Sequence, residues 1–305
     1  MAPDRRPLPS WLILCLALGL ATPLWGGHPG VAADAGRQAR PEAPTSQDVP
    51  TPVALTGSQQ TYTSRLLGQQ RRYAVALPPG YADHPERRYP VIVLLHGGSG
   101  DQGDWFDPLK GDALATLQTL YRQGELPPSI VVAPDGNDRR GRSRFWDPQY
   151  FDGPNGPMAT ALGDELATVI QSRYRTLPAP RHWALGGLSS GAWGALNIGL
   201  KWPDHYSILF SHSGYMQDAS GPANSPMTAL PALSAARLRA LRVYLDSGSD
   251  DGRYRQQSAR FHALLDQLGV TNVFHVFPGS HSWRYWREHL ADSLRFVGAQ
   301  WSDLG

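Results

Sequence analysis

The stretch that decides the fold is Trp183-Ala-Leu-Gly-Gly-Leu-Ser-Ser-Gly-Ala192, in which a short apolar run leads into a helix-like segment. Its centre fits the pattern Gly-x-Ser-x-Gly, with Gly187, Ser189 and Gly191 at the fixed positions. A serine at the tip of a sharp turn from strand to helix has a strained backbone, and side chains two residues before and after it would collide. The two glycines therefore favour Ser189 as a nucleophile.

The next residue, Ser190, does not fit this pattern, because Leu188 and Ala192 stand where glycines are needed. Its backbone N–H lies at the start of the expected helix, so we predict that it is one donor of an oxyanion hole. The motif alone leaves an alternative without catalysis, a glycine-rich start of a helix, because the chain contains 32 glycines.

Short apolar runs alternate with helical patterns along the rest of the chain. We expect buried strands at 91–95, 130–133, 183–185, 208–210, 243–245 and 273–276, and an edge or antiparallel strand at 72–77. Helical patterns cover 109–121, 158–174, 192–201, 255–268 and 285–296. This alternation predicts an α/β fold with a mostly parallel sheet, helices on both faces, and a site at the carboxyl ends of the strands.

A second oxyanion donor is expected where the run 91–95 leads into His96-Gly-Gly-Ser-Gly100. Glycines allow the backbone to approach a substrate and to turn an N–H toward a developing negative charge. The N–H of Gly98 is the expected donor, with that of Ser99 as the next choice. We expect His96 to hold this loop through side-chain hydrogen bonds.

A general base is expected late in the chain, after the acid. His262 and His289 fall inside helical patterns, and His275 lies in a strand. His281 follows a strand in a loop before the last helix, where it can reach over the edge of the sheet toward Ser189. We therefore predict His281 as the base.

Three aspartates compete for the role of the acid. Asp246 still belongs to the end of the strand 243–245, and we expect its carboxylate to hold the turn through backbone N–H groups. Asp250 and Asp251 follow Gly248, where the chain has room to point back to His281. Asp251 is favoured and Asp250 stays open. A calcium loop would need a further acidic ligand downstream, so we predict no metal site.

Aromatic side chains near these segments suit a sugar or a phenolic acyl group. We expect Trp105, Trp146 and Trp283 to line the substrate site, although tryptophan in a domain of this size also serves in the core. The arginines in 139–144 could bind an acidic substrate or could simply be exposed to solvent.

Composition excludes several classes of function. The chain of 305 residues has 28 Lys and Arg against 26 Asp and Glu, a net charge of +2 that favours no nucleic-acid partner. The single cysteine, Cys15, lies near the N-terminus, so the rest of the chain can form no disulfide and no zinc–thiolate site. No cofactor is expected, and the sequence does not indicate an oligomeric state.

The N-terminus has the pattern of a targeting segment. Arg5 and Arg6 precede an apolar stretch that is short for a membrane span, and small residues at 31–33 suit signal peptidase. We predict a signal peptide at 1–33, a flexible Pro- and Ala-rich linker at 34–53 and one domain at 54–305. Cleavage after Ala35, lipidation of Cys15 and an uncleaved anchor are alternatives. The expected location is periplasmic or extracellular.

From about residue 60 to 300 the chain resembles the putative-esterase family of α/β-hydrolases, which includes feruloyl and acetylxylan esterases, S-formylglutathione hydrolase, enterochelin esterases and the antigen 85 mycolyltransferases. The stretches that carry the resemblance are Leu94-Leu-His-Gly-Gly98 with Trp105 after it, Val132-Ala-Pro-Asp-Gly136, Asp164-Glu-Leu-Ala-Thr-Val-Ile-Gln-Ser-Arg-Tyr174, Gly187-Leu-Ser-Ser-Gly-Ala192 and Gly279-Ser-His-Ser-Trp-Arg-Tyr-Trp286. The family's acid pattern, Asp-x-Gly-x-x-Asp, laid onto 246–251 also returns Asp251. Unlike many members, this chain has no Met-Gly after the serine, and its loop 137–157 is long and polar.

The resemblance implies an α/β-hydrolase fold and acyl transfer through an acyl-enzyme. We expect an exported serine carboxylesterase with the triad Ser189, His281 and Asp251, acting on a small-molecule or carbohydrate ester such as an acyl or feruloyl ester. The alternatives are an antigen 85-like acyltransferase to a sugar hydroxyl and a non-catalytic cell-surface binding module. Neither the esterase reaction nor the acyltransferase reaction requires a metal or an organic cofactor.

Overall fold

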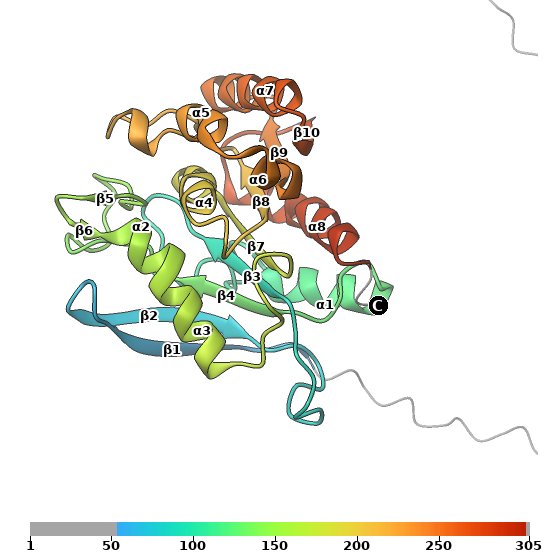
Figure 1. Ribbon diagram of the computed structural model, residues 1–305. Helices are drawn as coiled ribbons and strands as arrows, with labels where there is room; N and C mark the ends of the chain where they lie inside the picture. The colour runs from blue at the N-terminus through green and yellow to red at the C-terminus, as the bar shows by residue number, and fades with distance from the viewer. Residues whose placement is uncertain (1–53, 303–305) are drawn as a thin grey trace, which may run out of the picture. The chain divides into compact units, whose positions relative to one another are not determined.

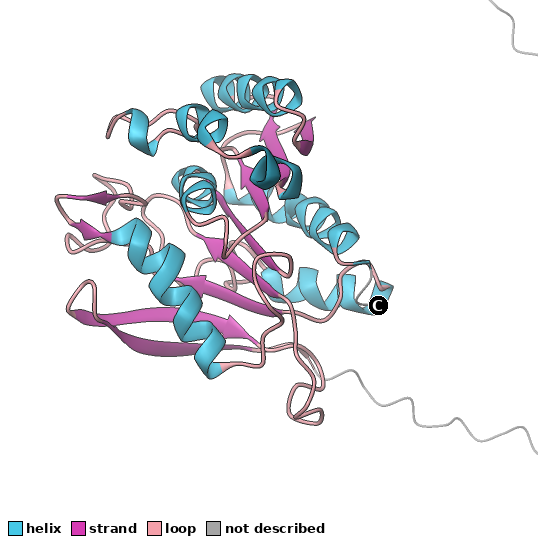
Figure 2. Ribbon diagram, in the orientation of Figure 1, coloured by secondary structure: helices cyan, strands magenta, loops and turns pink. Residues whose placement is uncertain are grey.

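The computed structural model describes residues 54–302, in which an eight-stranded sheet has helices on both faces (Figure 1; Figure 2). The signal peptide predicted for 1–33 and the linker predicted for 34–53 lie outside the described residues, as do the last three residues of the predicted domain. Among the helices of residues 54–302, none combines the length and the apolar character that crossing a membrane requires.

The sheet has the strand order β1-β2-β4-β3-β7-β8-β9-β10. Its strands are β1 (Gly57–Ser64), β2 (Gln69–Ala76), β3 (Val91–Leu95), β4 (Ile130–Pro134), β7 (Trp183–Leu188), β8 (Ile208–His212), β9 (Arg242–Gly248) and β10 (Thr271–Phe277). β2 pairs antiparallel with β1 and β4, and the pairs from β4 to β10 are all parallel. The carboxyl ends of six parallel strands therefore meet at one edge. A separate small hairpin joins β5 (Asp152–Gly153) and β6 (Gly156–Pro157).

Helices cover the two faces in two groups. α1 (Ala113–Gln123) and α8 (Trp283–Gln300) pack together against one face. The opposite core contains residues of α3 (Leu166–Arg173), α4 (Ser190–Lys201) and α7 (Gly252–Gln267). The shorter elements are α2 (Met158–Thr160), η1 (Ala161–Glu165), η2 (Pro222–Asn224), α5 (Pro226–Ala229), η3 (Leu230–Ala232) and α6 (Ala235–Ala240).

β3 shows why the sequences of the central strands are continuous apolar runs. Val91, Val93 and Leu95 point into the core beneath α3 and α4, whereas Ile92 and Leu94 point into the core beneath α1 and α8. All five side chains are at most 1% exposed. Because both faces are covered, each of these side chains contributes about 1.5–3 kcal/mol of burial free energy.

The predicted α/β architecture is confirmed, and the differences are local. β1 was not predicted, because its polar sequence GSQQTYTS forms an exposed edge with only two buried side chains. The helix expected at 109–121 begins instead at Ala113, since Leu109 is 85% exposed and Asp112 has a left-handed φ of 46°. The helix expected at 158–174 contains a π-helical turn, η1.

A buried ion pair joins β8, β9 and α8. The Nδ1 atom of His212 lies 2.7 Å from Asp246 Oδ2, and both side chains are completely buried. Tyr285 Oη donates to the other carboxylate oxygen over 3.1 Å. The expectation that Asp246 bonds to backbone N–H groups is therefore wrong, because its carboxylate is directed into the core rather than toward the turn.

Hydrogen bonds complete the surroundings of this pair. Ser293 Oγ donates to the carbonyl of Leu290 and lies 3.0 Å from His212 Nε2. Both ring nitrogens of His212 and both carboxyl oxygens of Asp246 therefore have partners inside the core, without access to water.

We predict that Asp246→Ala destabilises the protein by about 3–5 kcal/mol, because it leaves the buried imidazole of His212 and the hydroxyl of Tyr285 without their shared partner. The matched control is Glu288→Ala, which removes the carboxylate of an exposed pair with Arg284 and should cost less than about 1 kcal/mol. The measurement is the midpoint of unfolding in urea. The dependence of the unfolding free energy on urea concentration, the m-value, should be the same in all variants. Equal midpoints for the two variants would contradict the prediction.

Candidate active site

Ser189 lies in a tight turn between β7 and α4, at the carboxyl edge of the sheet. Its backbone has a φ of 53° and a ψ of −122°, a conformation that is strained for a residue with a side chain. A Cβ at Gly187 would lie 2.6 Å from the carbonyl oxygens of Gly191 and Leu95, and one at Gly191 would lie 2.4 Å from that of His96. Only glycine fits at both positions, so the turn exists because of the two residues that the motif singled out.

Ser189, His281 and Asp251 form a continuous chain of contacts. His281 Nε2 lies 2.8 Å from Ser189 Oγ, and His281 Nδ1 lies 3.0 Å from Asp251 Oδ1. The carboxylate can only accept a hydrogen bond, so Nδ1 carries the proton and Nε2 is left to accept the serine proton. The three side chains come from the loops after β7, β10 and β9. This geometry suits a general base acting on a nucleophilic hydroxyl.

The loops that carry the acid and the base are joined by their backbones. Ser249 N donates to Phe277 O over 2.7 Å, and Asp250 N donates to Gly279 O over 2.9 Å. A Cβ at Gly248 would lie 2.4 Å from the carbonyl oxygen of Gly279. This close approach fixes the distance between the Asp251 loop and the His281 loop.

The structure separates the two aspartates that the sequence left open. Asp251 is 5% exposed and precedes the first turn of α7, where its side chain reaches His281. Asp250 is exposed, and its carboxylate accepts a hydrogen bond from Ser249 Oγ instead. The remaining late histidines lie in α7, β10 and α8, away from this chain of contacts.

Two aromatic rings that the motif search did not assign hold the imidazole of His281. Tyr254 stacks on its face with the ring centroids 4.2 Å apart, and Trp286 meets it edge-on at 4.8 Å. The indole N–H of Trp286 donates to Ser213 Oγ over 3.2 Å. Tyr254 follows Asp251 by three residues at the start of a helix, a spacing that places both side chains on one face and could have revealed it.

The two predicted oxyanion donors belong to segments that meet at Ser189. Ser190 is the first residue of α4, so its N–H has no acceptor within the helix. Gly98 is exposed in the loop after β3, and its neighbour Gly97 packs so closely that a Cβ there would lie 3.3 Å from Ser189 Cβ. The role of the two amides as an oxyanion hole stays a prediction.

Three side chains from the long polar loop after β4 hold the loop that contains Gly98. Tyr150 Oη donates to His96 O over 2.7 Å, Asn137 Nδ2 donates to Gly100 O over 2.9 Å, and Arg142 Nε donates to Ser99 O over 2.7 Å.

His96 itself is buried and accepts a hydrogen bond from the N–H of Gly136 on Nε2 over 2.9 Å. Burial lowers its pKa, so the imidazole is neutral, and its other nitrogen donates to Gly97 O.

The three tryptophans expected at the substrate have different surroundings. Trp105 has no exposed surface and donates its indole N–H to Leu95 O over 3.0 Å, so its expected contact with substrate is wrong and it serves in the core. Trp283 is half-buried and packs edge-on against Trp105 and Trp286. Trp146 is 38% exposed in the polar loop, with Arg140 over its ring.

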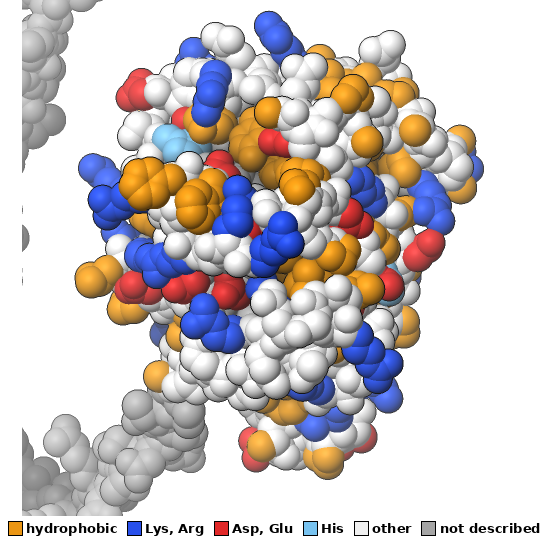
Figure 3. All heavy atoms as spheres, turned by 90° about the vertical axis from the view of Figure 1, so that its left-hand side faces the viewer, with side chains coloured by type: hydrophobic (Ala, Val, Ile, Leu, Met, Phe, Trp, Pro, Cys, Tyr) orange, Lys and Arg blue, Asp and Glu red, His pale blue; other side chains and the backbone are white. Residues whose placement is uncertain are grey.

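Two of the loop arginines are already paired. Arg140 binds Asp138 at 2.6 Å and Arg142 binds Asp101 at 2.9 Å. Figure 3 shows one face of the molecule, on which a histidine side chain reaches the surface beside hydrophobic and acidic side chains. Within residues 54–302 no group of three or more His, Cys, Asp or Glu side chains is arranged to hold a metal ion.

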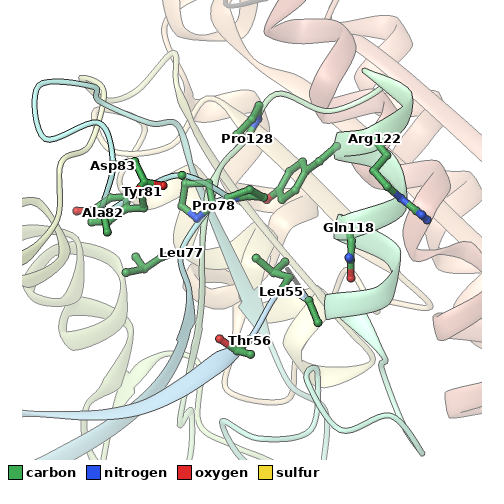
Figure 4. A pocket seen from close by; sticks show the side chains of 14 residues that line it. Leu55, Thr56, Leu77, Pro78, Tyr81, Ala82, Asp83, Gln118, Arg122 and Pro128 are labelled. Carbon is green, nitrogen blue, oxygen red and sulfur yellow. The ribbon is translucent and has the colours of Figure 1, made fainter. Parts of the chain in front are cut away.

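Figure 4 shows a different feature, an apolar cavity of about 690 Å³. It is lined by Leu55, Leu77, Tyr81 and Pro128, with Arg122 beside them. Pro128 lies two residues before the start of β4, so the cavity lies at the amino ends of the parallel strands. Neither Ser189 nor His281 lines it, and we give it no part in the candidate site.

Comparisons with known proteins show the family and the fold. The family model described as putative esterase matches residues 64–297. A solved structure of a ferulic acid esterase is 27% identical, with a TM-score of 0.73 over 81% of this chain and 98% of that one. The iron(III) enterobactin esterase of Escherichia coli K12 is 25% identical over 96% of this chain and 71% of its own length.

An uncharacterized protein of Corynebacterium glutamicum is 27% identical over 80% of this chain, and the match spans 60% of that longer protein. The family match covers well over half of the chain, and the structural likeness covers 81% of it. The chain therefore belongs to the putative esterase family, an α/β-hydrolase family of serine hydrolases that act on carboxylic ester bonds.

Proposed function

We propose that this chain is a serine carboxylesterase that works through Ser189, His281 and Asp251. The observation that carries the proposal is the unbroken chain of contacts from Ser189 Oγ through His281 to Asp251. The strained turn that exposes the serine supports it, because such strain persists where the surrounding structure enforces it for a purpose.

In the proposed reaction, His281 Nε2 takes the proton of Ser189 as Oγ attacks the ester carbonyl. The N–H groups of Gly98 and Ser190 hold the negative oxygen that forms. His281 then gives its proton to the leaving alcohol, and an acyl-enzyme remains. Water attacks this ester with His281 again as base, and Asp251 keeps the imidazole in the required tautomer throughout.

The proposed substrates are esters of small or phenolic acids, including those of carbohydrates. Support comes from the likeness to a ferulic acid esterase and from the exposed indole of Trp146. The exposed and half-buried aromatic surface suits a sugar ring or a phenol. We also propose export to the periplasm or the medium, on the pattern of residues 1–33, which lie outside the described residues.

We predict that Ser189→Ala lowers ester hydrolysis by about 10⁶-fold, because the nucleophile is lost. The measurement compares 4-nitrophenyl acetate, 4-nitrophenyl butyrate and methyl ferulate as substrates. Ser143→Ala, in the exposed polar loop, is the matched control and should keep full activity. A folded Ser189→Ala variant that hydrolyses these esters as fast as the natural sequence would refute the proposed nucleophile.

The choice of acid gives a second prediction. Asp251→Asn should lower kcat by about 10⁴-fold, since an amide can leave the imidazole in the wrong tautomer. Asp250→Asn changes the same charge one residue away and should have less than about a threefold effect, because its carboxylate bonds to Ser249. Steady-state kinetics of both variants test which aspartate is the acid. A larger loss of kcat in Asp250→Asn than in Asp251→Asn would assign this role to Asp250.

A further inference from the structure

Asp147 lies directly against the loop that supplies the proposed oxyanion donor. A Cβ at Gly98 would lie only 2.1 Å from Asp147 Oδ1. The absence of a side chain at Gly98 therefore leaves room for this carboxylate. The position is unusual for an anion, because negative charge develops beside the same loop during ester hydrolysis.

The carboxylate of Asp147 has no partner of its own. Among residues 54–302, no hydrogen bond or ion pair to it is present, whereas its acidic neighbours are paired. Those partners are Arg140 for Asp138, Arg142 for Asp101, and the amide of Ser220 for Asp218. Asp147 is exposed, so a bound molecule can reach its free acceptor oxygens.

Charged groups on separate segments act on this carboxylate. Its partial burial raises its pKa, the carboxylate of Asp218 raises it further, and His281 and Arg253 oppose the shift. The close approach of Asp147 Oδ1 to Gly98 places the carboxylate beside the proposed oxyanion donor. A substrate whose carbonyl oxygen is held by that donor therefore passes close to Asp147.

The backbone of Asp147 is held in place. Arg140 Nη2 donates to its carbonyl over 3.2 Å and also binds Asp138 at 2.6 Å, and the guanidinium lies 5.3 Å from the ring of Trp146. The residues that follow, up to Tyr150, are buried. An acceptor held in this way loses little freedom when a ligand binds.

We propose that Asp147 sets substrate specificity, accepting hydrogen bonds from hydroxyl groups of a neutral ester and disfavouring esters with an anionic group beside the scissile bond. This rests on the proposed function of the site. Two anions in a cleft repel each other, whereas a carboxylate forms strong hydrogen bonds with hydroxyl groups.

The test uses three acetyl esters that differ only in the alcohol: ethyl acetate, glycerol monoacetate and O-acetyl-lactate. In the full chain, kcat/KM should be highest for glycerol monoacetate and lowest for O-acetyl-lactate. Asp147→Asn should lower the ratio of glycerol monoacetate to ethyl acetate about tenfold and raise that of O-acetyl-lactate to ethyl acetate about tenfold.

The matched control is Asp83→Asn, which makes the same charge change at the opposite edge of the sheet. It should leave both ratios unchanged. The rate with ethyl acetate reports whether each variant is folded and active, so the ratios isolate the effect of the alcohol. Unchanged ratios in Asp147→Asn, or equal shifts in the control, would overturn the proposal.

A binding measurement separates this proposal from the proposed function. Glycerol monoacetate is titrated into Ser189→Ala and into the double variant with Asp147→Asn, and binding is followed by NMR. We expect about tenfold weaker binding in the double variant, and equal binding would overturn the role of Asp147. Ester hydrolysis that survives Ser189→Ala would instead contradict the proposed nucleophile, whatever the alcohol preference.

Discussion

The close approach of two backbone segments is the constraint on which the site depends. The turn between β7 and α4 presses against the end of β3, so that Gly187 and Gly191 lie next to the carbonyl oxygens of Leu95 and His96. No side chain fits between them. The parallel pairing of β3 with β7 brings these segments together, and the helix that follows directs its free N–H groups at the nucleophile. A change at either glycine would therefore disturb the sheet edge and the reactive serine together.

Side-chain packing holds the imidazole of His281 in place, as close backbone contact holds Ser189. Tyr254 and Trp286 confine the ring of His281, and Trp286 is tied through Ser213 to the carbonyl of Asp246. The carboxylate of that same aspartate forms the buried pair with His212. The proposed base thus packs against a polar network inside the core. Such a network favours one arrangement of the loops over others.

The sequence was informative where a property is local. Apolar runs without polar interruption predicted the central strands, because both faces of these strands are covered, and the glycine spacing predicted the turn at Ser189 for steric reasons. It was less informative where a residue's role depends on distant neighbours. β1 is stabilised by pairing with β2 rather than by its own apolar residues. Trp105 and Asp246 are buried by helices from other parts of the chain, and the position of Asp147 depends on the path of a long loop.

The turn at Ser189 and the polar loop with Trp146 are held by different kinds of contact. This difference affects which substitutions the protein can accept during evolution. The proposed chemistry depends on backbone atoms packed so closely that no side chain fits at Gly187 or Gly191. The polar loop with Trp146 and Asp147 is held by arginine side chains at the surface. Substitutions in this loop remove little buried apolar area and carry a small cost in stability. New substrate preferences can therefore evolve at the rim while the catalytic turn stays constant.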